Sequence, residues 1–191
     1  MSTLSLILAA VLLQAAAPQK MEIVEGNPAS PVKVQIFEDL QCSDCAAFRR
    51  LLDEKILPRF GKQVAFVHRD FPLPKHGWAR QAAMAGRWVY ERNAEAGILF
   101  RQQILAEQNN ISVESLPKWL LEFAARNKLD EKGILDSVKD ARLAAAVERD
   151  YQSAVGRGIS KVPTVYTAGV PLVETILFDD LVRAIENALT K

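Results

Sequence analysis

The chain has 191 residues, of which 49% are hydrophobic and 25% charged, and its 24 basic and 23 acidic residues leave a net charge of +1. This length suits one domain with a real core, and the composition excludes an intrinsically disordered protein. Because basic and acidic residues are interspersed, no surface for binding polyanions is indicated. We therefore expect no nucleic-acid partner, and we interpret the charges as a solvated surface.

Residues 1–17 differ in character from the rest of the chain. The stretch Leu4–Leu13 is almost wholly apolar and is followed by Gln14 and three alanines, which is typical of a secretory signal. A membrane span needs about 20 residues, so this stretch is short for one. No basic residue precedes it and Pro18 follows the best cleavage position, which leaves an uncleaved anchor or a buried helix open. We expect a signal peptide or anchor and a periplasmic or otherwise extracytoplasmic location.

Hydrophobic periodicity predicts two strands around a helix in the first part of the chain. The helix carries its apolar residues on one face and is expected to end at Pro58. The segment after the second strand contains two prolines, which break regular structure. The predicted segments are a short extended stretch at 21–24, a strand at 32–37, a helix at 46–57 and a strand at 63–68.

The middle of the chain is helix-forming almost throughout, and the last forty residues return to strands. This order of elements predicts an α/β fold, in which a mixed central sheet is flanked by helices and a helical block is inserted. Trp78, Met84 and Trp88 recur at helical spacing and are expected in the core. The predicted helices are 76–92, 98–108, 113–128 and one or two from Asp130 onward, followed by strands at 162–167 and 171–177 and a helix at 178–189.

Only two cysteines occur, Cys42 and Cys45, separated by two residues. Disulfide frameworks staple distant segments, so this pair indicates redox chemistry or metal binding. It lies where a strand passes into a helix, and the free N–H groups and dipole of a helix N-terminus lower the pKa of a thiol. We expect Cys42, the first and more exposed, to be the nucleophile, and Cys45 to resolve a mixed disulfide.

Zinc binding is a weaker interpretation of the cysteine pair. A closed zinc site needs four ligands, and the two histidines, His68 and His76, lie on separate segments without ligand spacing. We therefore predict no metal and no organic cofactor. A protein that binds metal through its two thiolates stays open as an alternative.

A second motif is Val162-Pro163-Thr164, where a proline stands at the head of a strand. A cis bond in a turn is one reason for such a proline. Together with Phe37 leading into Cys42-x-x-Cys45, and with Phe71-Pro72-Leu73-Pro74, this motif makes the chain resemble the DsbA-like branch of the thioredoxin superfamily. The resemblance covers nearly all of residues 18–191. It implies a thioredoxin-like fold, with a core of residues 19–72 and 157–191 and an inserted helical subdomain of residues 73–156.

The resemblance also implies a function. It is that of an exported thiol–disulfide oxidoreductase that exchanges disulfides with protein substrates, in the first instance as a disulfide donor. The resemblance implies that the Val162–Pro163 bond is cis and that the Val162 backbone contacts a bound peptide. A quinone-linked membrane protein would reoxidise the cysteine pair. A disulfide reductase, supplied by a reductant, would use the same residues, and we expect a monomer in either case.

The dipeptide Ser43-Asp44 between the cysteines is expected to tune the redox potential. The strong oxidant of the family carries a histidine at the position of Asp44, where a positive group stabilises the thiolate. A carboxylate near Cys42 would disfavour the thiolate by like-charge repulsion. The reduced form of the protein would then be less stable than in the strong oxidant. We therefore predict a weaker oxidant than the strongest members of the family.

The chain also departs from the family beneath the cysteine pair. Family members often carry an acidic residue at the position of Ile36, where it assists proton transfer from the second cysteine, and an isoleucine cannot do so. The nearby Glu38 or Asp39 is an alternative source of this carboxylate, but we interpret both as solvated loop residues. For His76, which matches the family pattern, we expect a loop or capping role.

Overall fold

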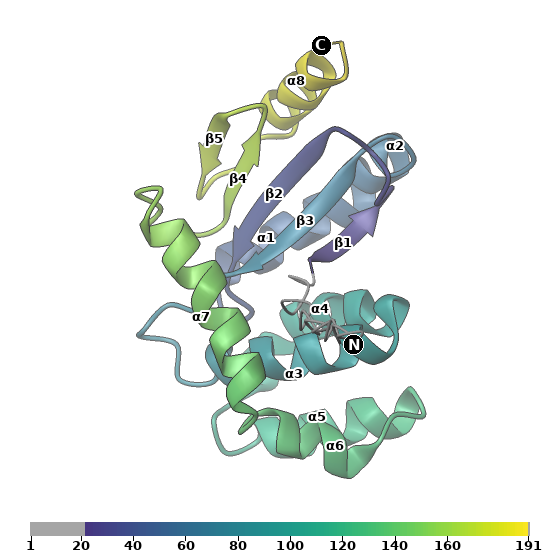
Figure 1. The fold of residues 1–191 in the computed structure, drawn as a ribbon, viewed down its shortest axis with the longest axis vertical. Helices are drawn as coiled ribbons and strands as arrows, with labels where there is room; N and C mark the ends of the chain where they lie inside the picture. The colour runs from purple at the N-terminus through teal and green to yellow at the C-terminus, as the bar shows by residue number, and fades with distance from the viewer. Residues whose placement is uncertain (1–21, 191) are drawn as a thin grey trace, which may run out of the picture.

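The computed structural model describes residues 22–190, and five strands of this part of the chain form one mixed sheet (Figure 1). The strand order is β1-β3-β2-β4-β5. Strands β2 and β3 run parallel, whereas the other three neighbouring pairs are antiparallel. The predicted mixed sheet is confirmed. The strands are β1 (Ile23–Gly26), β2 (Lys33–Glu38), β3 (Ala65–Asp70), β4 (Thr164–Thr167) and β5 (Val170–Val173).

The helices fall into two groups. One group, α1, α2 and α8, packs against a face of the sheet, and the other, α3 to α7, is inserted between β3 and β4 and extends beyond the sheet (Figure 1). A π-helical turn, η1, joins α1 to α2, and a short 3-10 helix, η2, follows α4. The helical elements are α1 (Ser43–Leu51), η1 (Leu52–Ile56), α2 (Leu57–Phe60), α3 (Ala79–Arg92), α4 (Ala94–Glu107), η2 (Gln108–Asn110), α5 (Leu116–Arg126), α6 (Glu131–Ser137), α7 (Ala141–Val155) and α8 (Phe178–Leu189).

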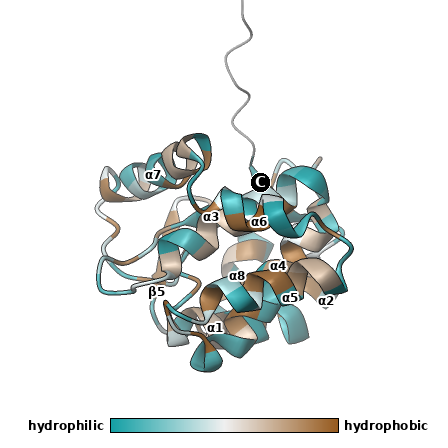
Figure 2. Ribbon diagram, turned by 90° about the horizontal axis from the view of Figure 1, so that it is seen from below, coloured by the Kyte–Doolittle hydropathy of each residue, from teal (hydrophilic) through white to brown (hydrophobic). Residues whose placement is uncertain are grey.

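The face of the sheet that carries α1, α2 and α8 is apolar. Alternate residues of β2, Val34 and Ile36, point into it and are fully buried, as a strand with a period of two requires. The helices contribute one apolar stripe each, and Figure 2 shows hydrophobic and hydrophilic residues on the same ribbons. The buried residues of this cluster are Val34, Ile36, Phe48, Leu52, Ile56, Phe60, Val64, Phe66, Val165, Leu181, Val182 and Ile185.

The first helix differs from the prediction at both ends. It begins at Ser43 rather than at residue 46, so the Cys-x-x-Cys sequence forms its first turn. It also continues past Pro58, and the expected stop there is wrong. The helix widens into the π-helical turn η1, which places Pro58 in the first turn of α2, where a missing N–H costs little. The helical path then ends at Gly61, whose N–H donates to the Leu57 carbonyl at 2.8 Å.

The other predicted elements are present with shifted ends. Helix α3 begins at Ala79, because residues 71–78 form a loop around the two prolines. The stretch from Asp130 contains two helices, α6 and α7, where the sequence predicted one or two. Strand β5 ends at Val173, four residues before the predicted end. Trp78, at 1% exposed, and its two predicted core partners are buried as expected.

The predicted signal peptide or anchor of residues 1–17 lies outside the described residues. Between residues 22 and 190, no helix combines the length and the hydropathy that crossing a membrane requires.

The interface between the sheet and the inserted helices carries buried charges. Arg101 of α4 is 1% exposed, and its Nη2 lies 2.9 Å from an oxygen of Glu38 and 2.9 Å from an oxygen of Asp70. Arg87 of α3 donates to Asp70 at 2.5 Å and pairs with Asp150 of α7. The interpretation of the charges as a solvated surface is therefore wrong for this group. Each buried charge touches an opposite one, which offsets the cost of leaving water.

A second arm of this charge cluster runs from β2 across β3 to β1. His68 of β3 lies between two carboxylates, with Nδ1 2.6 Å from Glu38 and Nε2 3.2 Å from Glu25. Burial opposes a charge on His68, but the Glu38 charge and the hydrogen bond to Glu25 outweigh it and raise the pKa of His68. Burial likewise opposes ionisation of Glu38, yet Arg101 and His68 bring the pKa of Glu38 to about 2. Arg49 of α1 completes the arm by donating to Glu25 at 2.8 Å.

Candidate active site

The turn between β2 and α1 places both cysteines at the start of the helix. Cys42 is the N-cap residue, with an extended backbone (φ −87°, ψ 126°), and Cys45 lies in the first helical turn. Both are reduced thiols. Cys42 is 8% exposed and Cys45 is 0% exposed, so Cys42 is the more accessible of the two, as predicted.

The two thiols have opposite acidities. A hydrogen bond from the Cys45 thiol is the main reason why the pKa of Cys42 is lowered to about 6. Burial opposes this shift, and the backbone N–H groups of Cys45 and Asp44 at the helix N-terminus assist it. Burial, and then the neighbouring Cys42 sulfur, raise the pKa of Cys45 well above its ordinary value. At neutral pH the site therefore holds a Cys42 thiolate beside a Cys45 thiol.

The segment before β4 lies against Cys42. The Val162–Pro163 peptide bond is cis, as the resemblance implies, and the Cys42 Sγ lies 3.8 Å from the Val162 carbonyl oxygen. These residues are 120 positions apart in sequence. Strand β4 brings them together, because Thr164 pairs with Phe37 at the end of β2.

Residues of the inserted helical region also form hydrogen bonds with the active-site turn. The backbone N–H of Trp78, at the start of α3, donates to Gln41 Oε1 at 3.0 Å. Gln108 is 9% exposed, and its Nε2 donates to the Cys42 carbonyl at 3.3 Å. Neither glutamine was singled out from the sequence, because a glutamine carries no local signal that distinguishes a solvated side chain from a buried hydrogen-bond donor.

The interpretation of Glu38 and Asp39 as solvated loop residues is wrong, since they are 2% and 1% exposed. Glu38 belongs to the buried charge cluster. Asp39 Oδ2 accepts from the Leu73 N–H at 2.6 Å and lies 2.8 Å from His76 Nδ1, while the Asp39 N–H donates to Cys45 Sγ at 3.4 Å. The position of Asp39 at the end of a buried strand was the available signal, because side chains there still lie within the core. His76 lies in the loop before α3, as expected.

A family model described as Thioredoxin matches residues 18–187, which is most of the chain. The chain belongs to the thioredoxin family, in its DsbA-like branch. It is a thiol–disulfide oxidoreductase, and Cys42 and Cys45 are its Cys-x-x-Cys pair. Comparison with curated proteins finds no match.

Several solved structures share this fold. BdbD from Bacillus subtilis, in its oxidised form, has a TM-score of 0.79 and 23% sequence identity, over 89% of this chain and 94% of that chain. Alpha-DsbA1 from Wolbachia pipientis has a TM-score of 0.76 and 20% identity, over 91% of this chain and 92% of that chain. DsbA from Chlamydia trachomatis has a TM-score of 0.71 and 20% identity, over 86% and 89%. The thioredoxin-like fold with an inserted helical region is thereby established.

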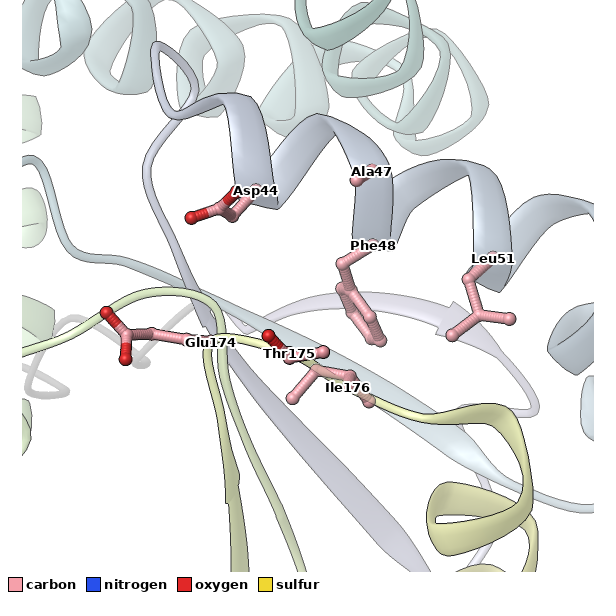
Figure 3. A pocket seen from close by; sticks show the side chains of 7 residues that line it. All are labelled: Asp44, Ala47, Phe48, Leu51, Glu174, Thr175 and Ile176. Atoms are coloured by element: carbon pink, nitrogen blue, oxygen red, sulfur yellow. The ribbon is translucent and has the colours of Figure 1, made fainter.

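Ser43 and Asp44 lie on the exposed side of the first turn of α1 in this DsbA-like chain. The Asp44 side chain borders a cavity of 230 Å³ between α1 and the segment that follows β5, and Glu174 stands opposite (Figure 3). Phe48 and Ile176 form part of the apolar wall. The negative side chain that raises the pKa of Cys42 is that of the buried Asp39.

No group of three or more His, Cys, Asp or Glu side chains within residues 22–190 is arranged to hold a metal ion.

Proposed function

We propose that this DsbA-like oxidoreductase donates disulfides to exported proteins through Cys42 and Cys45. The observation that supports this direction is the contrast between the two thiols, with the pKa of Cys42 lowered to about 6 and that of Cys45 raised. A stabilised thiolate stabilises the reduced protein, and a stable reduced form makes the corresponding disulfide a better oxidant.

The reaction follows from this asymmetry. A substrate thiolate attacks Cys42 Sγ in the Cys42–Cys45 disulfide, so that a mixed disulfide forms and the S–S bond to Cys45 breaks. Cys45 leaves as a thiolate, takes up a proton and stays buried. A second substrate thiolate then attacks the substrate sulfur of the mixed disulfide and releases Cys42, whose low pKa makes it a good leaving group. The substrate loses two electrons, and the cysteine pair retains them.

Val162 and Pro163 are proposed to bind the substrate backbone. The Val162 carbonyl lies 3.8 Å from Cys42 Sγ, so a peptide attached to that sulfur would run along this segment. The cavity between Asp44 and Glu174 (Figure 3) adjoins this segment, because the Glu174 N–H donates to the Pro163 carbonyl at 2.8 Å, and it would take substrate side chains.

The cycle requires a partner that removes the two electrons. We propose a quinone-linked membrane protein for this step and a location outside the cytoplasm, in keeping with the signal-like residues 1–17. The chemistry uses no metal and no organic cofactor. The protein would act as a monomer.

The first test is the equilibrium redox potential of the cysteine pair, measured in glutathione buffers by alkylation and mass spectrometry. We expect a value between that of thioredoxin, about −270 mV, and that of the strongest DsbA oxidant, about −120 mV. A value near −270 mV would instead support the alternative, a reductase of exported proteins.

The second test assigns the roles of the two cysteines. In Cys45→Ser, the Cys42 thiolate should attack a substrate disulfide and stay attached as a mixed disulfide while the second substrate sulfur leaves as a thiolate, because the resolving thiol is missing. Cys42→Ser is the matched control and should trap nothing and turn over nothing. If Cys42→Ser retained activity, the proposed chemistry would be refuted. Stoichiometric metal after purification together with no turnover would support the metal-binding alternative.

A third test concerns Ser43 and Asp44 as residues that tune the potential. Asp44→His would bring a donor near the helix N-terminus and should lower the Cys42 pKa and make the protein a stronger oxidant. Ser43→Ala is the neighbouring control. An unchanged or higher Cys42 pKa in Asp44→His would remove Asp44 from this role.

A further inference from the structure

Asp39 occupies the centre of the active-site turn. Its backbone contacts both cysteines, since its N–H donates to Cys45 Sγ at 3.4 Å and its carbonyl accepts from the Cys42 N–H at 3.1 Å. Its carboxylate is 0% exposed and faces away from solvent, toward the loop before α3. There it accepts the N–H groups of Gln41 at 2.7 Å and Leu73 at 2.6 Å.

This carboxylate belongs to the residue whose backbone contacts both cysteines, so its charge lies in the same turn as the reacting sulfur. The charge of Asp39 raises the pKa of Cys42, against the hydrogen bonds that lower it. Burial in turn raises the pKa of Asp39, although the backbone N–H groups and His76 offset part of this effect. Two anions in one buried site disfavour each other, so the ionisation of Cys42 and that of Asp39 are coupled.

His76 is the group that can balance the Asp39 charge. Its Nδ1 lies 2.8 Å from Asp39 Oδ2, and its side chain is 17% exposed. The ring also lines a cavity of 370 Å³ together with Pro74, Arg80 and Tyr151. The ring therefore contacts solvent on one side and a fully buried carboxylate on the other.

We propose that Asp39 and His76 form a positioning pair that sets the charge felt by the Cys42 sulfur. A protonated His76 offsets part of the Asp39 charge and so favours the Cys42 thiolate. When His76 is neutral, the uncompensated Asp39 charge disfavours the thiolate and makes the disulfide a weaker oxidant. This inference rests on the proposed redox role of Cys42, and it assigns to the buried Asp39 the effect expected from Asp44.

The other charged groups around the pair have partners or lie in solvent. Glu38 raises the pKa of Cys45 but is itself matched by His68 and Arg101. Arg80, on the same cavity as His76, pairs with Glu148 of α7 at 2.8 Å. Asp44 on α1 is exposed. Asp39 is therefore the buried carboxylate whose net charge depends on a solvent-accessible histidine.

The test is the thiolate titration of Cys42, followed through its rate of alkylation from pH 4 to 9 with mass readout, in four variants. Asp39→Asn removes the charge and should raise the rate at pH 5 about tenfold, the equivalent of one unit of pKa. His76→Asn keeps a donor toward Asp39 but not the positive charge, and should lower the rate several-fold at pH 5 while leaving the rate at pH 8 unchanged. In the double variant, the His76 effect should disappear. Arg80→Gln, on the same cavity, is the matched control and should leave the curve unchanged.

Additive effects in the double variant, or an Asp39→Asn curve that coincides with that of the wild type, would overturn the inference. If Asp39→Asn does not fold, His76→Lys decides, since a positive charge at this position should restore the rate at pH 5 that His76→Asn loses, whereas a lost structural contact would not be restored. Turnover on a reduced substrate is measured in parallel. Normal turnover with unchanged titration curves would refute the pair alone, whereas absence of turnover in the wild type would refute the proposed function.

Discussion

Two interfaces of the β2–β3 region, an apolar side and a charged side, are stabilised in different ways. On one side, α1, α2 and α8 cover the sheet with apolar side chains such as Leu181 and Ile185, both fully buried. On the charged side, the ends of β2 and β3 meet α3, α4 and α7 through buried ion pairs centred on Arg101, and Arg49 of α1 extends this cluster to β1. The inserted helices also carry an apolar cluster of their own. The apolar side is stabilised by the burial of hydrophobic surface, which does not require particular side chains to be aligned. The charged side depends on the alignment of specific pairs, because a buried charge without its partner costs several kcal/mol.

The redox site lies where the charged side reaches the active-site turn. Glu38 and Asp39 are consecutive residues, and they carry the charged side directly into the active-site turn. A buried ion-pair cluster fixes one arrangement of the insertion against the sheet, and that arrangement sets the hydrogen bonds to Asp39, Gln41 and Cys42. We therefore expect the charged interface to align the insertion with the active-site turn, and to lose stability when one partner of an ion pair is removed.

The largest effect is expected from breaking the charged side at its centre. Arg101→Met keeps most of the side-chain volume but leaves Glu38 and Asp70 without their shared cation. The free energy of unfolding should fall by about 3–5 kcal/mol. Urea denaturation at pH 7 measures this loss, and a loss below about 1 kcal/mol would show that water or another cation replaces Arg101.

A similar but smaller loss is expected from the apolar side. Leu181→Ala removes a fully buried side chain of α8 and should cost about 2–5 kcal/mol, through lost burial and the cavity left behind. This loss should be the same at pH 7 and pH 4, because no titrating group lies in the apolar cluster. A strong dependence on pH would contradict the separation of the two sides.

The charged side should titrate at both ends of the pH range. The pKa values of Glu25 and Glu38 are lowered to about 2, so their stabilisation is present above the ordinary carboxyl pKa and is lost as the pH falls from about 5 toward 2. His68 has a raised pKa, so its contribution is complete below its ordinary value and is lost as the pH rises through the raised value. Unfolding midpoints from pH 2 to 10 measure both. Glu38→Gln should reduce the acid loss, on the order of 2 kcal/mol for one carboxylate of this kind.

The smallest effect is expected for an ion pair outside the interface. Arg142 pairs with Glu91 at the surface, with the Arg142 side chain 59% exposed. Arg142→Ala should change the free energy of unfolding by less than about 1 kcal/mol, and less still in high salt. This variant is the control for Arg101→Met. A loss as large as that of Arg101→Met would mean that burial does not distinguish the two pairs.

Local pattern was sufficient for most of the fold and for the reacting atoms. The alternation in β2, the amphipathic stripe of α8 and the placement of Cys42-x-x-Cys45 between a strand and a helix all follow from residues that are neighbours in sequence. The main error in the elements, the predicted end at Pro58, arose because a π-helical turn is set by how the helix packs and has no local signature.

Residue order alone predicts the α/β order of elements, the apolar face of the sheet and the Cys-x-x-Cys pair at a helix N-terminus, because each depends on periodicity or on contacts within one turn. Which charges are buried depends instead on the folded chain. Whether Asp39, Arg101 or Gln108 faces water or the interior depends on segments that lie far away in sequence, and these segments supply the hydrogen bonds and opposite charges that make burial affordable. The environment of the Cys42 sulfur is for this reason a property of the assembled fold.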